Sequence, residues 1–289
     1  MLNTEHLWQI AKYRAAPLAI AHAHAARMLD FDPAMLARAG AMRGAARATP
    51  ARSTRNRSGR DVIRLHGICE GGAPGIYTLL GMGFSTQAIE REIALSVADD
   101  NCSEIVLSFN TPGGSVEGVP ELVNALRAAA RVKVLTAMVE YQACSAGYWL
   151  ASQCDRIIAS PSSEVGSIGV YTAHQDVSGA MAKAGISNTY VSAGKYKTEG
   201  RPDAPLSKDA TAWMQASVDR VYDQFVAAVA LGRNVSRAEV MKSYGQGRSM
   251  GAAAAKKAGL VDHVAASVEA APFSAALAQK QTRTLSRGH

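Results

Sequence analysis

Strand-like and helix-like segments alternate through the middle of this 289-residue chain, and this alternation restricts its possible folds more than any other feature. Apolar runs at 62–65, 104–109, 132–139 and 156–159 alternate with amphipathic runs at 85–99, 119–131 and 145–152. Units of about 25–30 residues, each a strand followed by a helix, are typical of a parallel sheet built by crossover connections. We therefore predict an α/β body that begins at Asp61.

The C-terminal half continues the mixed pattern. Strands are predicted at 168–172 and 189–192, with a helix at 177–184 between them. A long amphipathic helix is predicted from Lys208 to Leu231, with shorter helical segments near 236–243 and 250–258. Residues 270–289 contain no acidic residue and no clear core pattern, so we expect a frayed tail there.

The formal net charge of +7 is concentrated at the N-terminus. Residues 1–60 contain ten Lys and Arg against three Asp and Glu, so 10 − 3 gives +7, and the remaining residues contain 21 of each sign. An isoelectric point of 9.3 suggests nucleic acid as a partner, but the excess charge belongs to residues 1–60 alone. We predict an N-terminal helical segment within 1–39, chiefly at 5–29, and a basic linker at 40–60. We expect no sequence-specific nucleic-acid binding. Three roles stay open for residues 1–60: they could bind DNA through charge alone, act as a tether or be removed.

Composition also bears on the cellular compartment. No run reaches the roughly 18–20 apolar residues that a membrane span needs, and the apolar stretch Ala15 to Leu29 is interrupted by Arg27 and two histidines. The four cysteines form no C-x-x-C pair, which argues against a zinc ribbon or a disulfide framework. We therefore expect a cytoplasmic protein with buried free thiols and no bound metal.

Three segments contain residues suited to chemistry. Pro112-Gly113-Gly114 follows a strand, and paired glycines let backbone N–H groups face an oxyanion, although an ordinary turn has the same pattern. Ser145 is placed between a strand and a helix, where it is either a nucleophile beside a free N–H group or a helix cap. Lys195 and Lys197 lie in the polar loop 194–200. A lysine that becomes partly buried can act as a base, whereas a solvated lysine cannot.

In their order along the chain these segments resemble the signal peptide peptidase A family of serine peptidases. The resemblance covers residues 61–265 and rests on NTPGGSV (110–116), ACSAGYWLASQCDRIIA (143–159), VGSIGV (165–170), SAGKYKTEG (192–200) and GRSMGAAAAKKAGLVD (247–262). Within the family the chain is most similar to the lambda-type phage capsid assembly (prohead) proteases, which have a single repeat and no membrane anchor. The resemblance implies an α/β Clp-protease/crotonase-like fold with repeated β-β-α units.

The resemblance also implies a catalytic Ser–Lys dyad. Ser145 matches the nucleophile, and Lys197 matches the general base because Lys197 to Pro202 fits the family's Lys-x-x-Gly-x-Pro, whereas Lys195 lies two residues too early. Ser167 matches a serine that helps to hold the lysine in relatives. The expected oxyanion-hole donors are the backbone N–H groups of Gly113, Gly114 and Ala146. No cofactor or metal is expected.

The function implied is a serine endopeptidase that processes scaffold or capsid proteins during phage head assembly, in the host cytoplasm or inside the prohead. Residues 61–265 would form the peptidase domain and 266–289 a flexible C-terminal tail. As in relatives, the site is expected at a subunit boundary of a homo-oligomer.

The residues leave four alternatives open. The chain could be a bacterial peptidase that degrades signal peptides, or a non-proteolytic crotonase-like protein, because one fold hosts several chemistries. Cys144 could supply a thiol nucleophile, or His174 and Asp176 could complete a Ser–His–Asp triad with Ser145. The motif position of Ser145 and the offset of His174 fit the lysine dyad better.

Overall fold

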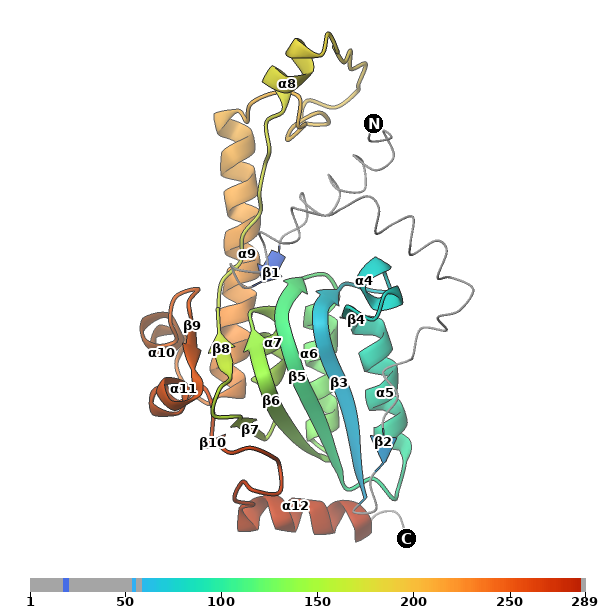
Figure 1. Ribbon diagram of the computed structural model, residues 1–289, viewed down its shortest axis with the longest axis vertical. Helices are drawn as coiled ribbons and strands as arrows, with labels where there is room; N and C mark the ends of the chain where they lie inside the picture. The colour runs from blue at the N-terminus through green and yellow to red at the C-terminus, as the bar shows by residue number, and fades with distance from the viewer. Residues whose placement is uncertain (1–17, 21–53, 56–58, 287–289) are drawn as a thin grey trace.

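The computed structural model describes residues 18–20, 54–55 and 59–286 (Figure 1). The predicted α/β class is confirmed: the centre is a largely parallel sheet with strand order β10-β7-β6-β5-β3-β2. Its long strands are β3 (Arg60–Glu70), β5 (Glu104–Ser115) and β6 (Val134–Cys144). On one side follow β7 (Arg156–Ala159) and β10 (His263–Val264), and on the other β2 (Thr54–Arg55) pairs antiparallel with β3.

Short strands extend the sheet at the carboxyl ends of its long strands. β4 (Gly83–Ser85) pairs with β3, and β8 (Glu164–Gly166) pairs with β6 and with β9 (Ser249–Gly251). β1 (Leu18–Ile20) pairs antiparallel with the end of β5.

The register of the long strands places alternate residues on the two faces of the sheet. Ile63, Leu107 and Ala137 are paired in one row and are completely buried. The row two residues farther along each strand, Leu65, Phe109 and Val139, repeats this pattern. Their side chains form the core against α5 (Thr86–Ala98), α6 (Val119–Ala130) and α7 (Ala146–Ala151), which lie behind the sheet in Figure 1. Period-two alternation therefore explains why this face holds the core.

Helix α7 lies deepest, and all six of its residues are buried. The Trp149 ring stacks on Phe225 of α9 (Lys208–Gly232) at a centroid distance of 4.5 Å. Only the C-terminal half of α9 packs in this way, apart from Ala210. Its N-terminal half projects away from the sheet, and α8 (Ser178–Lys183) with its flanking loops lies at the projecting end (Figure 1). We call residues 171–207 the arm.

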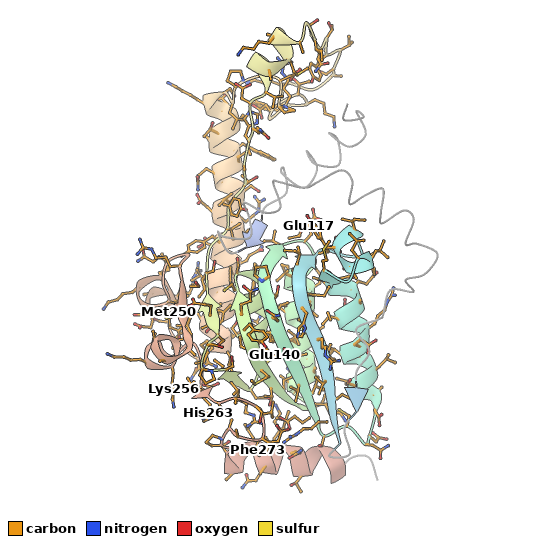
Figure 2. All side chains as sticks on the ribbon, viewed as in Figure 1. Glu117, Glu140, Met250, Lys256, His263 and Phe273 are labelled. Atoms are coloured by element: carbon orange, nitrogen blue, oxygen red, sulfur yellow. The ribbon has the colours of Figure 1, made fainter. Side chains whose placement is uncertain are left out.

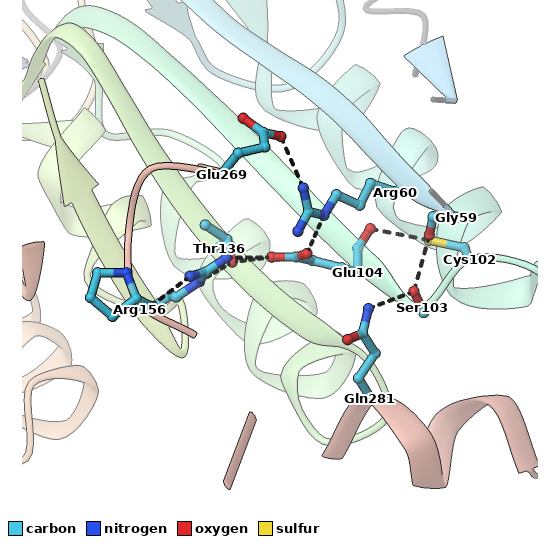
Figure 3. A network of polar contacts seen from close by, with 10 residues as sticks. Gly59, Arg60, Cys102, Ser103, Glu104, Thr136, Arg156, Glu269 and Gln281 are labelled. Carbon is cyan, nitrogen blue, oxygen red and sulfur yellow. Dashed lines mark hydrogen bonds and ion pairs between the residues drawn. The ribbon is translucent and has the colours of Figure 1, made fainter. Parts of the chain in front are cut away.

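The chain after α9 returns to the sheet through α10 (Arg237–Ser243), β9, α11 (Ala252–Ala258) and β10. A buried polar network then holds the C-terminal segment to the amino ends of the long strands (Figure 3). The fully buried Glu104 carboxylate accepts bonds from Arg60 (2.7 Å) and Arg156 (3.1 Å), and Arg60 also reaches Glu269. The guanidinium of Arg156 lies over the Phe273 ring, which is labelled in Figure 2.

Helix α12 (Ala275–Ser286) corrects the prediction of a frayed tail after residue 270. Lys280 pairs with Asp155 at 2.6 Å, and Gln281 donates to Ser103 Oγ at 2.9 Å. These bonds cross 125 and 178 residues of sequence, so no local pattern indicated them.

Two further expectations of local structure are corrected. Pro112-Gly113-Gly114 does not follow the strand but lies within β5, because β3 pairs alongside it through Ile68 and Cys69, and the alternative of an ordinary turn is excluded. Residues 168–172 and 189–192 are not strands of the sheet. Just before them lies β8, which stops pairing with β6 at Gly166, after which the chain runs on into the arm.

At the N-terminus, β1 replaces part of the helix predicted at 5–29, because Leu18–Ile20 pairs with another strand. The other residues of the predicted helical segment lie outside the described residues. The predicted linker 40–60 contains β2, and its last residue opens β3.

Candidate active site

Ser145 lies between the end of β6 and the first residue of α7, in a backbone conformation that residues other than glycine rarely adopt. Its φ is 56° and its ψ is −121°, and its residue is only 1% exposed. Ser145 N–H donates to the Gly166 carbonyl (2.7 Å), and its own carbonyl accepts from Trp149 N–H (2.9 Å). A strained strand-to-helix turn that presents a serine hydroxyl is the arrangement of a nucleophile elbow.

Ser167 occupies the equivalent position on the neighbouring strand. β6 and β8 pair in parallel with Cys144 opposite Gly166, so the next residues, Ser145 and Ser167, lie side by side. Ser167 also has a positive φ of 54° and is 7% exposed. Ser145 Oγ lies 3.5 Å from the Gly169 carbonyl, two residues farther along this chain segment.

The glycines of β5 form another wall of the site. Thr111 pairs with Ala143, and both Gly113 and Ser145 lie two residues beyond this pair. Gly114 approaches β3 so closely that a Cβ atom would lie 2.1 Å from the Cys69 carbonyl oxygen. This position therefore requires glycine.

The three expected oxyanion donors differ in availability. Gly113 N–H donates to Thr111 Oγ1 at 3.1 Å. Ala146 is the first residue of α7, and the first N–H groups of a helix have no carbonyl partner within that helix. Ala146 is therefore a better candidate than Gly113, and Gly114 lies within β5, where it pairs with Cys69 of β3.

Lys197 is not brought to Ser145 within one chain. It is exposed, and its backbone N–H donates to Gly194 in a turn of the arm. The segment between α8 and α9 lies at the projecting end of α9, whereas β6 and α7 lie in the body (Figure 1). The other lysine of the loop, Lys195, has its ammonium group 4.7 Å from the centre of the Tyr196 ring.

The structure gives no support to the alternative nucleophile and triad. Burial, with Glu164 as a smaller contribution, raises the pKa of the Cys144 thiol to about 12, so that this group stays protonated. The His174 ring is within hydrogen-bonding distance of the Ala204 carbonyl (3.1 Å), and Asp176 accepts from Ser178 N–H. Both residues lie in the arm.

Residues 127–281, more than half of the chain, match the profile of peptidase family S49. The chain belongs to this family. The match includes Ser145, Ser167 and Lys197, and it extends beyond residue 265 into α12.

Individual relatives agree with this family. "Putative protease MJ0651" of Methanocaldococcus jannaschii is 35% identical over 57% of this chain and 53% of its own length. Capsid assembly protease C of Escherichia phage lambda is 30% identical over 46% and 30%, respectively. "Putative signal peptide peptidase SppA" of Enterococcus faecium is 30% identical over 57% and 48%. The chain thus spans about half or less of the length of these three relatives.

Among solved structures, a ClpP1 variant from Listeria monocytogenes is similar with a TM-score of 0.44 and 12% identity. The similarity covers 72% of this chain and 93% of that chain.

The described residues contain neither a candidate metal site nor a candidate membrane span. Within the described residues, no three His, Cys, Asp or Glu side chains gather so that they could hold a metal ion. No helix in this part of the chain is long and apolar enough to cross a membrane.

The sequence did not reveal a polar cluster on the face of the sheet opposite the helices. Ser108 Oγ donates to Glu140 (2.5 Å) and lies 2.9 Å from His66 Nε2. Glu140 stands on this face in Figure 2. The three residues come from β5, β6 and β3, and only strand register brings them together.

Proposed function

We propose that this S49 chain is a serine endopeptidase in which Ser145 is the nucleophile and Lys197 of a neighbouring copy is the general base. The single observation that carries this proposal is the conformation of Ser145 at the strand-to-helix turn, beside Ser167. A non-glycine residue at positive φ costs about 1–3 kcal/mol and is retained where function needs it.

The reaction would proceed by acyl transfer. The neutral Lys197 amine takes the Ser145 proton, and Oγ attacks the peptide carbonyl carbon. Backbone N–H groups of Gly114 and Ala146 stabilise the oxyanion, and the lysine then protonates the leaving amine as the C–N bond breaks. A water molecule, deprotonated by the same lysine, hydrolyses the ester and restores Ser145. Ser167, beside Ser145, would orient the lysine.

The surface of the arm supports a site shared between copies. Ile186, Tyr190, Val191 and Tyr196 are exposed in the arm, and Val191 is 98% exposed. Trp213, on the adjacent projecting half of α9, is 69% exposed. Several large apolar side chains gathered on one projecting element are typical of a protein–protein interface. A second copy that covers this surface would also remove Lys197 from water, as a lysine base requires.

We further propose that the substrates are scaffold or capsid proteins of a phage head, processed in the host cytoplasm or the prohead. The support is the relative named a capsid assembly protease together with the motif resemblance. The relative named a signal peptide peptidase supports the second candidate, degradation of signal peptides.

Co-expression with the scaffold and capsid proteins encoded beside this chain tests this proposal. The wild type should cleave the head proteins, and so should the control Cys144→Ala. The Ser145→Ala and Lys197→Ala variants should leave the head proteins uncut. A fluorophosphonate probe should label Ser145 in the assembled wild type. Processing by the Ser145→Ala variant would contradict the proposed nucleophile, and the absence of labelling would favour a non-proteolytic relative.

A further inference from the structure

The carboxyl end of β5 is paired on both sides, and one partner is the chain's own N-terminal segment. On one side, β3 pairs in parallel through Ile68 and Cys69 with Gly113 and Gly114. On the other side, β1 pairs antiparallel, with register pairs Leu18–Ser115, Ala19–Gly114 and Ile20–Gly113. Because a strand has two edges, β1 occupies the edge on the side of β6.

The strand β1 ends close to the level of Ser145 in the sheet. The last register pair between β5 and β6 is Thr111 with Ala143, after which β6 turns into α7. Ile20 is opposite Gly113, which lies two residues beyond Thr111, just as Ser145 lies two residues beyond Ala143. The backbone of β1 therefore reaches the level of Ser145 at Ile20. Figure 1 shows β1 beside the upper end of β5.

An extended peptide that adds a strand to a sheet edge is held by its main chain, whatever its side chains are. A peptidase needs this geometry, because an extended substrate exposes its carbonyl groups to the nucleophile. The edge of Gly113–Ser115 offers it, and the segment seated there is Leu18–Ile20.

We infer that this N-terminal segment is the enzyme's own substrate, bound on the β5 edge and cut by Ser145 directly after Ala19 or Ile20. The inference rests on the proposed peptidase function. Ser145 Oγ bonds to the carbonyl carbon of the cut residue, and its proton passes through the lysine to the departing nitrogen as the C–N bond breaks. That nitrogen becomes the new N-terminus of the body. One water molecule then hydrolyses the ester and releases the N-terminal fragment with a free carboxylate.

Self-cleavage would also open the edge. While Leu18–Ile20 is seated on Gly113–Ser115, another extended peptide cannot pair with the same residues. The intact chain should therefore hydrolyse an added peptide only after a lag, and the lag should end as the segment is released.

The full chain tests this inference in four forms: wild type, Ser145→Ala, Ala19→Pro/Ile20→Pro and the control Ala45→Pro/Ala46→Pro. Intact mass and N-terminal sequencing should find a new N-terminus at residue 20 or 21 of the wild type and of the control. Ser145→Ala should stay uncut. Ala19→Pro/Ile20→Pro should be cut at least about tenfold more slowly there, because proline lacks the N–H group that pairs with the edge strand. This variant should hydrolyse labelled casein without a lag.

The outcomes separate the inference from the function on which it rests. If the wild type hydrolyses labelled casein but keeps its N-terminus intact, self-cleavage is overturned and the peptidase stands. Cutting of Ser145→Ala at the same bond would also overturn it. If neither casein nor the N-terminus is cut, the proposed function fails together with the inference.

Discussion

Ser145 combines a structural cost with a proposed chemical role. Its φ of 56° is unfavourable for any residue with a Cβ atom, and two backbone hydrogen bonds hold it there. The strand end and the helix start thus fix the position of the hydroxyl before substrate arrives. Ser152, at the other end of α7, has an ordinary helical conformation and donates to the Trp149 carbonyl.

Substitutions at Ser145 should therefore separate stability from activity. Ser145→Ala should lower peptide hydrolysis by about 10³-fold or more, because it removes the nucleophile. Ser145→Gly should be equally inactive but about 1 kcal/mol more stable than Ser145→Ala, since glycine adopts positive φ without strain. Denaturant unfolding of both variants measures the difference. Equal stabilities would mean that the turn is not strained.

Among the elements, the sheet determines which distant residues meet. Strand and helix positions between 85 and 159 could be predicted well from hydrophobic periodicity, because each element has its own local pattern. Strand register could not be predicted, so the pairing of Cys144 with Gly166, which brings Ser145 beside Ser167, came only from the structure. The pairing of β1 with β5 was missed for the same reason, and the contacts of α12 were missed because they join residues far apart in the sequence.

The cluster of His66, Ser108 and Glu140 makes a pH-dependent contribution to the stability of the sheet. Burial lowers the pKa of His66, and the nearby Arg64 charge acts in the same direction, while Glu140 partly opposes both. A folded pKa below the unfolded value of about 6.5 means that the fold favours the neutral ring. This contribution is complete above about pH 6.5 and is lost as the pH falls through the folded pKa.

His66→Gln should remove this dependence while keeping a side chain that can bond to Ser108. The melting temperature of the wild type should fall more between pH 7.5 and pH 5.5 than that of His66→Gln, in the same buffers. Parallel melting curves for the two proteins would contradict the assigned direction of the pKa change.

At the scale of the whole molecule, the body and the arm carry different halves of the proposed site. Ser145 lies in the body, and Lys197 lies in the arm at the projecting end of α9 (Figure 1). A monomer with this shape would keep the nucleophile and the base apart. The exposed apolar side chains of the arm provide a surface for a second copy, whose Ser145 could then lie next to Lys197.

Val191→Asp tests this surface. A charge at this 98%-exposed position should shift the protein towards monomers in size-exclusion chromatography and lower activity about tenfold or more, without lowering the melting temperature of the body. Leu95→Asp on α5, at a 65%-exposed position away from the arm, is the matched control and should behave like wild type. An unchanged oligomer with full activity would remove the arm from the interface.

Complementation between two inactive variants tests the shared Ser–Lys site most directly. Ser145→Ala and Lys197→Ala, co-expressed with different tags and purified through both tags in turn, give mixed assemblies. In these, an intact serine from one variant can meet an intact lysine from the other. Each variant alone should be inactive, and randomly mixed assemblies should recover about a quarter of wild-type hydrolysis, since both partners of a site must be the intact ones. Mixed assemblies that form but remain as inactive as the separate variants would contradict the account.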